Sequence, residues 1–493
     1  MPINPIKRLA GETAIYGLGT MVPRFLNYLL VPFYTIMIFN QAEYGQITVL
    51  YSWVALLLVL LTYGMETSFF RFVSKSDNAA DVFNTATTAL LVTSIGFILL
   101  VVVFTQPIAQ IIDYPSNKEY ILYIGLIIAI DAFTALPFAQ LRHQNKARRF
   151  STIRILSVLL TIAFNLIFLW VIPKLAGERL MELPIYRSTN LVAFVFISNT
   201  LGSLATLAML TPELSSFKIN INWPLLRKML AYGLPILVIS LTGMINEVAD
   251  KILLKYFLPD SSTAEAQLGI YSASYKLAII MMLFIQMFRY AAEPFFFAEA
   301  DKKDAKKIYS QVMTYFVIFC WIIFLGVMLF IDLFKYFIGP GFWAGLTIVP
   351  IILAAKLFLG VFYNLSVWYK LTNNTLYGAI IAIVGSLITI VLNVIWIPKY
   401  GFIGAAWANF VCYFVIMAIS FIWGRQVYRI DYQYKRIILY SILGVVLYFG
   451  SLLFSNTPSN FQLLVNVFLF IGFASTAYFI EIKKNVRTKK NTN

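Results

Sequence analysis

The stretch MLAYGLPILVISLTGMINEVADKILLKYF, residues Met229–Phe257, is apolar for long enough to cross a lipid bilayer, since about 20 helical residues at about 1.5 Å each suffice. Inside it lie Glu247, Asp250 and Lys251, whose spacings of three and four residues put them on one helical face. Ionisable side chains in such a helix are costly and normally face a bundle interior or a water-filled cavity. Two interpretations stay open: a transport pathway, and an internal salt bridge that locks two helices. Pro235 donates no backbone hydrogen bond and is expected to kink or loosen the helix.

The composition excludes a soluble globular protein. The chain has 493 residues, of which 60% are hydrophobic and 12% charged, whereas soluble chains are about 25% charged. No segment outside the apolar stretches is long enough to fold as a separate soluble domain. We therefore expect one all-α polytopic membrane protein. The net charge of +16 lies in short loops between apolar segments, which argues against a nucleic-acid partner.

Fourteen segments have the length of a membrane-spanning helix. They are 13–38, 46–71, 83–106, 120–142, 151–172, 190–212, 229–257, 268–292, 308–334, 346–369, 376–397, 403–424, 436–454 and 462–480. If the N-terminus is cytoplasmic, 27 of the 38 Lys and Arg residues fall on or beside the cytoplasmic side, seven outside and four within the spans. The excess of basic residues in cytoplasmic loops is typical of membrane proteins. Both termini are therefore predicted to be cytoplasmic.

The sequence carries no pattern for a cofactor, a metal or catalysis. Cys320 and Cys412 lie in apolar segments, so neither a disulfide nor a metal site is expected. There is no nucleotide-binding G-x-x-x-x-G-K-[ST] motif, so transport would use an ion gradient or the substrate's own gradient. The longest predicted external loop, residues 173–189, is too short to house the site of a polysaccharide polymerase, and no enzyme activity is predicted.

A weak internal repeat relates the two halves of the chain. Residues 161–167, TIAFNLI, match residues 389–395, TIVLNVI, and each copy is followed by Ile-Pro-Lys. The copies are six helices apart, so both cross the membrane in the same direction, as in parallel-repeat transporters. This predicts an N-terminal lobe at 1–213, a cytoplasmic linker at 214–228, a C-terminal lobe at 229–427, and two additional helices with a basic tail at 428–493.

Charged and polar side chains at mid-depth are the candidate site. Arg24 lies on a polar stripe of the first helix with Tyr16, Thr20 and Asn27, about 17 Å from its cytoplasmic end at about 1.5 Å per residue. Arginine suits phosphate because its planar fork makes bidentate hydrogen bonds. A cavity shared by Arg24 and Lys356 would suit a pyrophosphate headgroup. The predicted substrate-binding residues are Arg24, Asn27, Lys276 and Lys356.

Acidic residues supply a second set of candidates. Asp131 lies near mid-depth, and Lys276 lies level with Glu247 and Asp250 and is expected to pair with one of them. Glu66 lies near Arg71 at the cytoplasmic mouth and is a candidate gate. The predicted ion-coupling or gating residues are Glu66, Asp131, Glu247, Asp250 and Lys251, with a proton or sodium ion as the coupling ion.

Several motifs resemble those of the polysaccharide (oligosaccharidyl-lipid) flippases of the multidrug/oligosaccharidyl-lipid/polysaccharide exporter superfamily. Glu43-Tyr44-Gly45 resembles the family's E-Y-G turn, residues 250–254 its D-[RK]-x-x-L, and residues 269–272 its G-x-Y-S. Residues 392–406, LNVIWIPKYGFIGAA, resemble its L-N…P-x-x-G-x-x-G-A-A, the most specific of the four. They occur in the family's order and span helices 1–12.

The resemblance implies a V-shaped bundle of two six-helix lobes around a cationic cavity. It also implies transfer of an undecaprenyl-pyrophosphate-linked oligosaccharide across the bacterial cytoplasmic membrane, for surface polysaccharides such as lipopolysaccharide O-antigen, beside a polymerase and other assembly proteins. Arg24 matches the position of a first-helix arginine in such proteins. The alternatives are an ion-coupled multidrug exporter of the same superfamily, for which an acidic cavity and twelve helices would be expected, and a membrane polysaccharide polymerase.

Overall fold

The computed structural model describes residues 5–76, 78–372, 374–454 and 457–490, and every regular element in these ranges is helical. This confirms the predicted all-α class. Two compact units divide the chain: unit 1 comprises residues 1–256 and 260–269, and unit 2 comprises residues 257–259 and 270–493. Unit 1 includes α13, with which the predicted C-terminal lobe begins. The lobes were predicted from a sequence repeat, whereas the units are defined by contacts, so the lobe boundaries remain a prediction.

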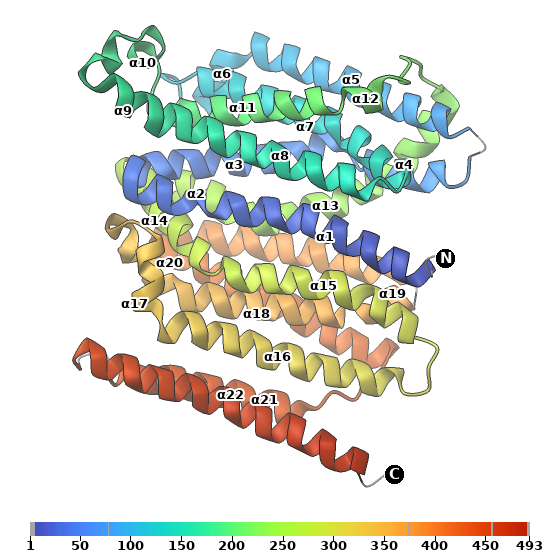
Figure 1. Ribbon diagram of the computed structural model, residues 1–493, viewed down its shortest axis with the longest axis vertical. Coiled ribbons are helices and arrows are strands. Elements are labelled where there is room, and N and C mark those ends of the chain that lie inside the picture. Colours follow the sequence, from blue (N-terminus) through green and yellow to red (C-terminus); the bar gives the residue numbers. More distant parts are fainter. Residues whose placement is uncertain (1–4, 77, 373, 455–456, 491–493) are drawn as a thin grey trace. The chain divides into compact units, whose positions relative to one another are not determined.

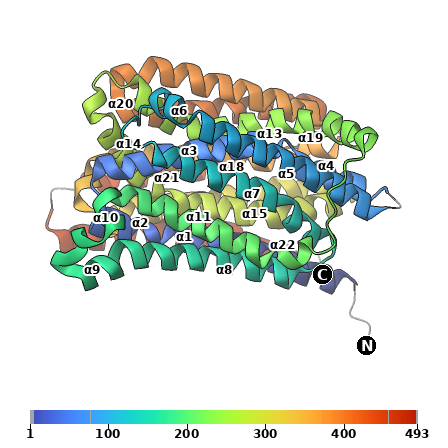
Figure 2. The same ribbon diagram turned by 90° about the horizontal axis from the view of Figure 1, so that it is seen from above.

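Unit 1 is built from long helices joined by short ones (Figure 1). Its elements are α1 (Pro5–Tyr28), α2 (Leu30–Pro32), the π-helix η1 (Phe33–Ile38), α3 (Gln41–Thr62), α4 (Met65–Val73), α5 (Ala79–Val103), α6 (Thr105–Ile111), α7 (Glu119–His143), α8 (Ala147–Leu166), the π-helix η2 (Ile167–Val171), α9 (Ile172–Ala176), the 3₁₀ helix η3 (Gly177–Glu182), α10 (Pro184–Ser188), α11 (Leu191–Met209), α12 (Thr211–Leu214), α13 (Trp223–Phe257) and the first half of α14 (Ser261–Leu277). In Figure 2, α9 and α10 lie beyond the end of α8, at one end of the unit.

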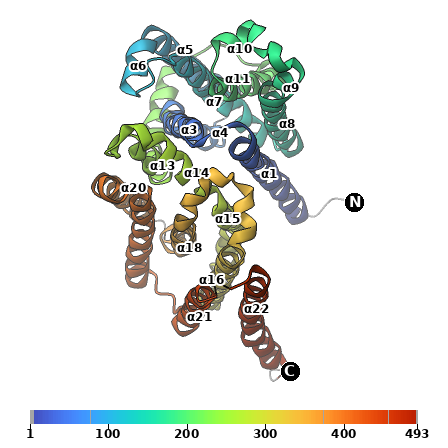
Figure 3. The same ribbon diagram turned by 90° about the vertical axis from the view of Figure 1, so that its left-hand side faces the viewer.

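Unit 2 holds the remaining helices. They are the second half of α14, α15 (Ile279–Glu299), α16 (Ala305–Leu329), α17 (Ile331–Phe334), the 3₁₀ helices η4 (Lys335–Phe337) and η5 (Pro340–Ile348), α18 (Val349–Leu365), α19 (Val367–Leu371), α20 (Thr375–Val427), α21 (Tyr434–Leu452) and α22 (Ser459–Lys490). The last two lie side by side and pack on α16 (Figure 3). Gly444 permits this, because a Cβ atom there would lie 2.3 Å from the Trp321 ring.

Among the described residues, thirteen helices are long and apolar enough to cross a membrane. One of them, α20, has 53 residues and contains Gly401 with φ 58° and ψ −141°, a conformation that essentially only glycine adopts. The Cys412 thiol donates a hydrogen bond to the carbonyl of Gly385, 27 residues earlier. A straight helix would separate those residues by about 40 Å, so α20 is a hairpin of two crossing segments. Counting it twice agrees with the fourteen segments predicted.

Several predicted segments are interrupted in the structure, and two of the interruptions lie well inside a segment. Segment 46–71 is interrupted by Tyr63 and Gly64, both with positive φ, between α3 and α4. Segment 268–292 is divided at Ala278 into α14, which begins at Ser261, and α15. Apolar length alone reveals neither break, because the residues on both sides remain hydrophobic.

The repeated motif has the same local structure in both copies. Asn165 and Asn393 are buried, and each side-chain amide donates to the carbonyl of the threonine four residues earlier. Each Ile-Pro-Lys is followed by a glycine with positive φ, Gly177 and Gly401. The first copy has more residues between its asparagine and its proline, and the π-helix η2 lies there, as expected where residues are inserted into a helix.

Two of the family-like motifs meet at the start of α3. Asn40 and Glu43 form a capping box, with each side chain accepting from the other's backbone N–H at 3.0 Å. One turn later, a Cβ atom at Gly45 would lie 2.0 Å from the carbonyl oxygen of Glu265. A Cβ atom at Gly269 would lie 1.9 Å from the carbonyl oxygen of Gln41. The glycines therefore let the backbones of α3 and α14 touch.

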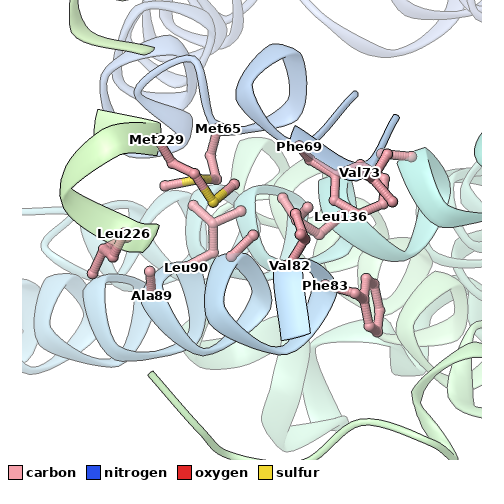
Figure 4. Close-up of a cluster of buried hydrophobic side chains, with 12 residues drawn as sticks. Met65, Phe69, Val73, Val82, Phe83, Ala89, Leu90, Leu136, Leu226 and Met229 are labelled. Atoms are coloured by element: carbon pink, nitrogen blue, oxygen red, sulfur yellow. The ribbon is translucent and has the colours of Figure 1, made fainter. Parts of the chain in front are cut away.

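A hydrophobic cluster holds the N-terminal end of α13 within unit 1 (Figure 4). Its members are Met65, Phe69 and Val73 of α4, Val82, Phe83, Ala86, Ala89 and Leu90 of α5, Leu136 and Ala139 of α7, and Leu226 and Met229 of α13. The Ser68 hydroxyl donates to the carbonyl of Met229 at 2.9 Å beside it. The cluster lies at helix ends that adjoin polar loops. There, burying each large side chain from water contributes about 1.5–3 kcal/mol.

The segment between α12 and α13 is bonded along α5. The backbone N–H groups of Lys218, Asn220 and Asn222 donate, at 3.1–3.2 Å, to side chains of α5, which are Asn84, Thr88 and Thr85 respectively. The Asn222 side chain also donates to Asp81 at 2.9 Å. These bonds satisfy backbone groups of an irregular segment that has no helical partners. The connection between α12 and α13 is therefore part of unit 1 and not a flexible linker.

Candidate functional site

The first candidate, Arg24, lies on α1, which packs closely on α8. A Cβ atom at Gly19 would lie 2.2 Å from the Ser151 hydroxyl, and that hydroxyl donates to the carbonyl of Ile15 at 2.8 Å. Arg24 and Asn27 follow on the same helix and both are exposed. Their spacing of three residues makes them neighbours on one face. The close α1–α8 contact thus positions a guanidinium and an amide together.

Arg154 of α8 is a second exposed guanidinium in this region. Its Cζ atom lies 3.9 Å from the centre of the Phe138 ring of α7, within the range of a cation–π contact. It interacts electrostatically with Asp131, Glu66, Arg142 and Arg24. These five groups, three basic and two acidic, carry a net charge of +1. A group with a formal positive charge is suited to an anionic ligand.

Asp131 of α7 is held by α11. One of its carboxylate oxygens accepts a hydrogen bond from the Ser203 hydroxyl at 2.8 Å. Asp131 is partly exposed, so one bond leaves part of its accepting capacity for water or another donor. This arrangement can exchange a proton or bind a cation near Arg154.

Glu66 has a different partner from the one expected. Its carboxylate forms an ion pair with Arg142 at 2.7 Å, and Arg71 instead lies over the Tyr232 ring, 4.0 Å from its centre. Arg71 lies five residues further along the same helix, on a different face from Glu66. The gating role of Glu66 remains a prediction. Arg142 belongs to α7, so the pair joins α4 and α7.

The acidic group of α13 forms a local ion pair. Asp250 is completely buried, and its Oδ1 atom accepts from the ammonium of Lys251 at 3.0 Å and from that residue's backbone N–H at 2.8 Å. The same ammonium donates to the carbonyl of Glu247 at 2.8 Å. These contacts stay within one helix. The ion-coupling role of the three residues remains a prediction.

Unit 2 contains the two lysines predicted to bind the substrate, Lys276 and Lys356. Lys356 of α18 is 1% exposed, and its ammonium lies 5.0 Å from the centre of both the Tyr275 and Tyr413 rings. Lys276, in the last turn of α14, is half-buried. The lysine and Arg24 candidates thus belong to different units, and their sharing of one cavity remains a prediction.

In the described part of the chain, no group of three or more His, Cys, Asp or Glu residues is arranged to hold a metal ion. Cys320 and Cys412 are both buried as free thiols.

Sequence reasoning missed Arg154 and Arg142, because both adjoin a basic cluster predicted to be a cytoplasmic loop. One signal points to Arg154. It starts a polar stripe on the fifth predicted helix with Ser157, Thr161 and Asn165, at steps of three, four and four residues. The same stripe packs α8 on its neighbours: Asn165 accepts from the Tyr34 hydroxyl at 2.7 Å, and Ser157 bonds Thr206.

The profile of a family described as "Polysaccharide biosynthesis protein" matches residues 9–298, more than half of the chain. The chain belongs to this polysaccharide biosynthesis protein family. The matched range runs from α1 to α15 and contains Arg24, Asp131 and Arg154. An uncharacterized membrane protein of Methanocaldococcus jannaschii is 21% identical over 457 residues, covering 86% of this chain and 84% of that protein.

Solved structures share the fold of this family member. The lipid II flippase MurJ in its inward closed conformation superposes with a TM-score of 0.74 at 16% identity, covering 95% of this chain and 100% of that one. An inward-facing multidrug resistance MATE family transporter of the MOP superfamily gives a TM-score of 0.60 at 14% identity, covering 85% and 97%. The family match confirms the polysaccharide part of the predicted resemblance. The two structures show that the family member shares the fold of a flippase and of an exporter. The thirteen apolar helices among its described residues are those of a multi-pass membrane protein.

Proposed function

We propose that this protein moves a lipid-linked oligosaccharide, carried on undecaprenyl pyrophosphate, from the inner to the outer leaflet of a bacterial cytoplasmic membrane. It acts by alternating access as a transporter and not as an enzyme. The product serves the assembly of a surface polysaccharide, such as lipopolysaccharide O-antigen, beside a polymerase and other assembly proteins. Both termini face the cytoplasm in this proposal, as the distribution of basic residues favours.

The observation that carries the proposal is the pair of exposed guanidinium groups of Arg24 and Arg154 in unit 1. Two planar forks bind the oxygens of a pyrophosphate with charge-assisted hydrogen bonds. The Phe138 ring under Arg154 holds one fork in orientation, which reduces the entropy lost on binding. Lys276 and Lys356 would contribute from unit 2 as further basic groups.

A multidrug exporter for cationic drugs is the rival from the same superfamily. Such an exporter would need carboxylates that are not outweighed by neighbouring cations. Asp131 is a candidate carboxylate, but Arg154 lies within its electrostatic range, and Arg24 lies within that of Arg154. The positive balance of the group favours an anionic headgroup over a cationic drug.

The test is translocation by the purified full-length protein in proteoliposomes. A fluorescent undecaprenyl-pyrophosphate oligosaccharide is supplied in the inner leaflet, and its appearance outside is followed with a membrane-impermeant quencher. Transfer well above that of protein-free vesicles is expected, with a cationic dye left untransported. Dye efflux without lipid transfer would instead establish the exporter.

Asp131, Glu247 and Asp250 are proposed as coupling groups, and Asp131 gives the clearest prediction. In Asp131→Asn, translocation should lose its dependence on an imposed proton or sodium gradient, because an amide neither titrates nor attracts a cation. Substrate binding should be retained. Asp332→Asn, at an exposed carboxylate of α17, is the control. Unchanged gradient dependence in Asp131→Asn would exclude Asp131 from coupling.

A further inference from the structure

Lys255, at the end of α13, has its ammonium enclosed by unit 1. The side chain is 3% exposed. The ammonium donates to the carbonyls of Ile112 and Asp113 at 3.1 and 3.4 Å and to the Glu265 carboxylate at 3.3 Å. It also lies 3.3 Å from the centre of the Tyr114 ring. Burial raises the pKa of the Tyr114 phenol well above its usual range, so that ring stays neutral.

Glu265 joins this lysine to a third helix. Its Oε1 atom accepts from Lys255, and its Oε2 atom accepts from the Gln46 amide of α3 at 2.7 Å. The backbone of the same residue touches Gly45, where the α3 and α14 backbones meet. One carboxylate thus ties the end of α13, the start of α14 and the start of α3 together.

The start of α14 is itself well defined. Asp260 accepts at Oδ1 from the Ser262 hydroxyl and backbone N–H, which hold its pKa below the usual range. It therefore stays ionised at neutral pH and caps the helix. Glu265 is consequently carried on an ordered turn and not on a fraying end.

The enclosed ion pair borders on a polar cavity of about 280 Å³. The cavity is lined by Gln46, by residues 113–117 of the α6–α7 loop, by Lys255, and by Ser261, Ala264 and Glu265 of α14. The Glu265 side chain is 21% exposed and that of Asp113 is 74% exposed. Polar space of this size can hold water. Water can therefore hydrate the charges as they separate, which lowers the cost that makes a dry buried pair permanent.

The division into units runs through α14. Residues 260–269 belong to unit 1, whereas the rest of this unbroken helix, residues 270–277, belongs to unit 2. Glu265 and Gly269 contact α3, and Glu265 is linked through Lys255 to the carbonyls of Ile112 and Asp113. Release of these contacts would loosen the first half of α14 from α3.

We propose that Lys255, Glu265 and Gln46 form an extracytoplasmic clasp, which closes the outward path and must open for release of the cargo. This rests on the proposed function for its direction, since the positive-inside pattern puts Lys255 at the outer end of α13. Opening of the clasp is a conformational change that can be measured without any transported lipid.

The first test covalently fixes the closed clasp. In a chain with both native cysteines replaced, Gln46→Cys and Glu265→Cys are joined by a short thiol-specific cross-linker. Translocation by the fixed protein should fall at least about tenfold and recover on cleavage of the cross-link. The matched control is Thr263→Cys with Gln267→Cys, neighbours within α14, whose cross-link should leave translocation unchanged. Full activity of the fixed protein would overturn the clasp.

The second test measures opening directly. Ala264 lines the cavity and is 1% exposed, so a thiol introduced by Ala264→Cys should react slowly with a membrane-impermeant maleimide. Adding Lys255→Met should raise that rate at least about tenfold, because an unpaired buried carboxylate favours the opened, hydrated state. Equal rates with and without Lys255→Met would refute the clasp. Absence of lipid transfer together with faster labelling would refute only the proposed cargo.

Discussion

Replacing Arg154 with alanine is expected to lower translocation of the lipid-linked oligosaccharide about 10- to 150-fold, with folding and membrane insertion intact. A hydrogen bond to a charged partner contributes about 1.5–3 kcal/mol, which corresponds to this range of rates or affinities. Arg24→Ala is expected to have an effect at least as large, because in the proposed site both guanidinium groups bind the same headgroup. The measurement is the proteoliposome assay, with size-exclusion chromatography to verify folding.

Two further variants separate charge from geometry. Arg154→Lys keeps the positive charge but loses the planar fork, so it should recover only part of the rate. Arg148→Ala removes an exposed basic residue of the same helix and should leave the rate within about twofold, as is usual for surface positions. Complementation of a flippase-deficient strain by both alanine variants would remove the guanidinium pair from the mechanism.

The largest structural effect is expected at Gly45. Its Cβ atom would lie 2.0 Å from a backbone oxygen of α14, so Gly45→Ala forces two helices apart and cannot be absorbed by a side-chain rotation. Overpacking of this kind costs about 1–3 kcal/mol and sometimes more. Gly269→Ala should act similarly. The measurement is the midpoint of thermal unfolding in detergent.

A glycine without neighbours supplies the control. Nothing lies within 4 Å of a Cβ atom at Gly96, and alanine is the better helix former by about 0.5–1 kcal/mol. Gly96→Ala should therefore be neutral or slightly stabilising. An equal loss of stability in Gly45→Ala and Gly96→Ala would show that close backbone contact is not what Gly45 provides.

Much of the fold follows from apolar length and charge distribution. These identified fourteen crossing segments, including the two that α20 merges. They missed the break at Ala278 and the contact of Gly45 with α14. A break between apolar residues leaves the hydrophobic pattern unchanged. The sequence also does not show which helix packs against a glycine. The two copies of the repeat have the same local hydrogen bonds at Asn165 and Asn393.

The site was less predictable, because sequence indicates the depth of a residue but not the direction in which its helix turns. Arg24 was identified by depth, whereas Arg154 was grouped with loop charges although its side chain lies over Phe138. Glu66 was assigned to a neighbour in sequence, but its partner Arg142 comes from another helix. The sequence analysis did not single out Lys255, although its side chain is 3% exposed.

The hydrogen bonds between α5 and the connection from α12 to α13 restrict where the chain can bend. Every second backbone N–H group of this segment, up to Asn222, donates a hydrogen bond to a side chain of α5. The segment therefore does not act as a flexible linker. If these hydrogen bonds persist, a bend of the chain after α11 must therefore occur beyond Asn222. Pro235 leaves one carbonyl of α13 without its usual donor and is a point beyond Asn222 at which this helix can bend.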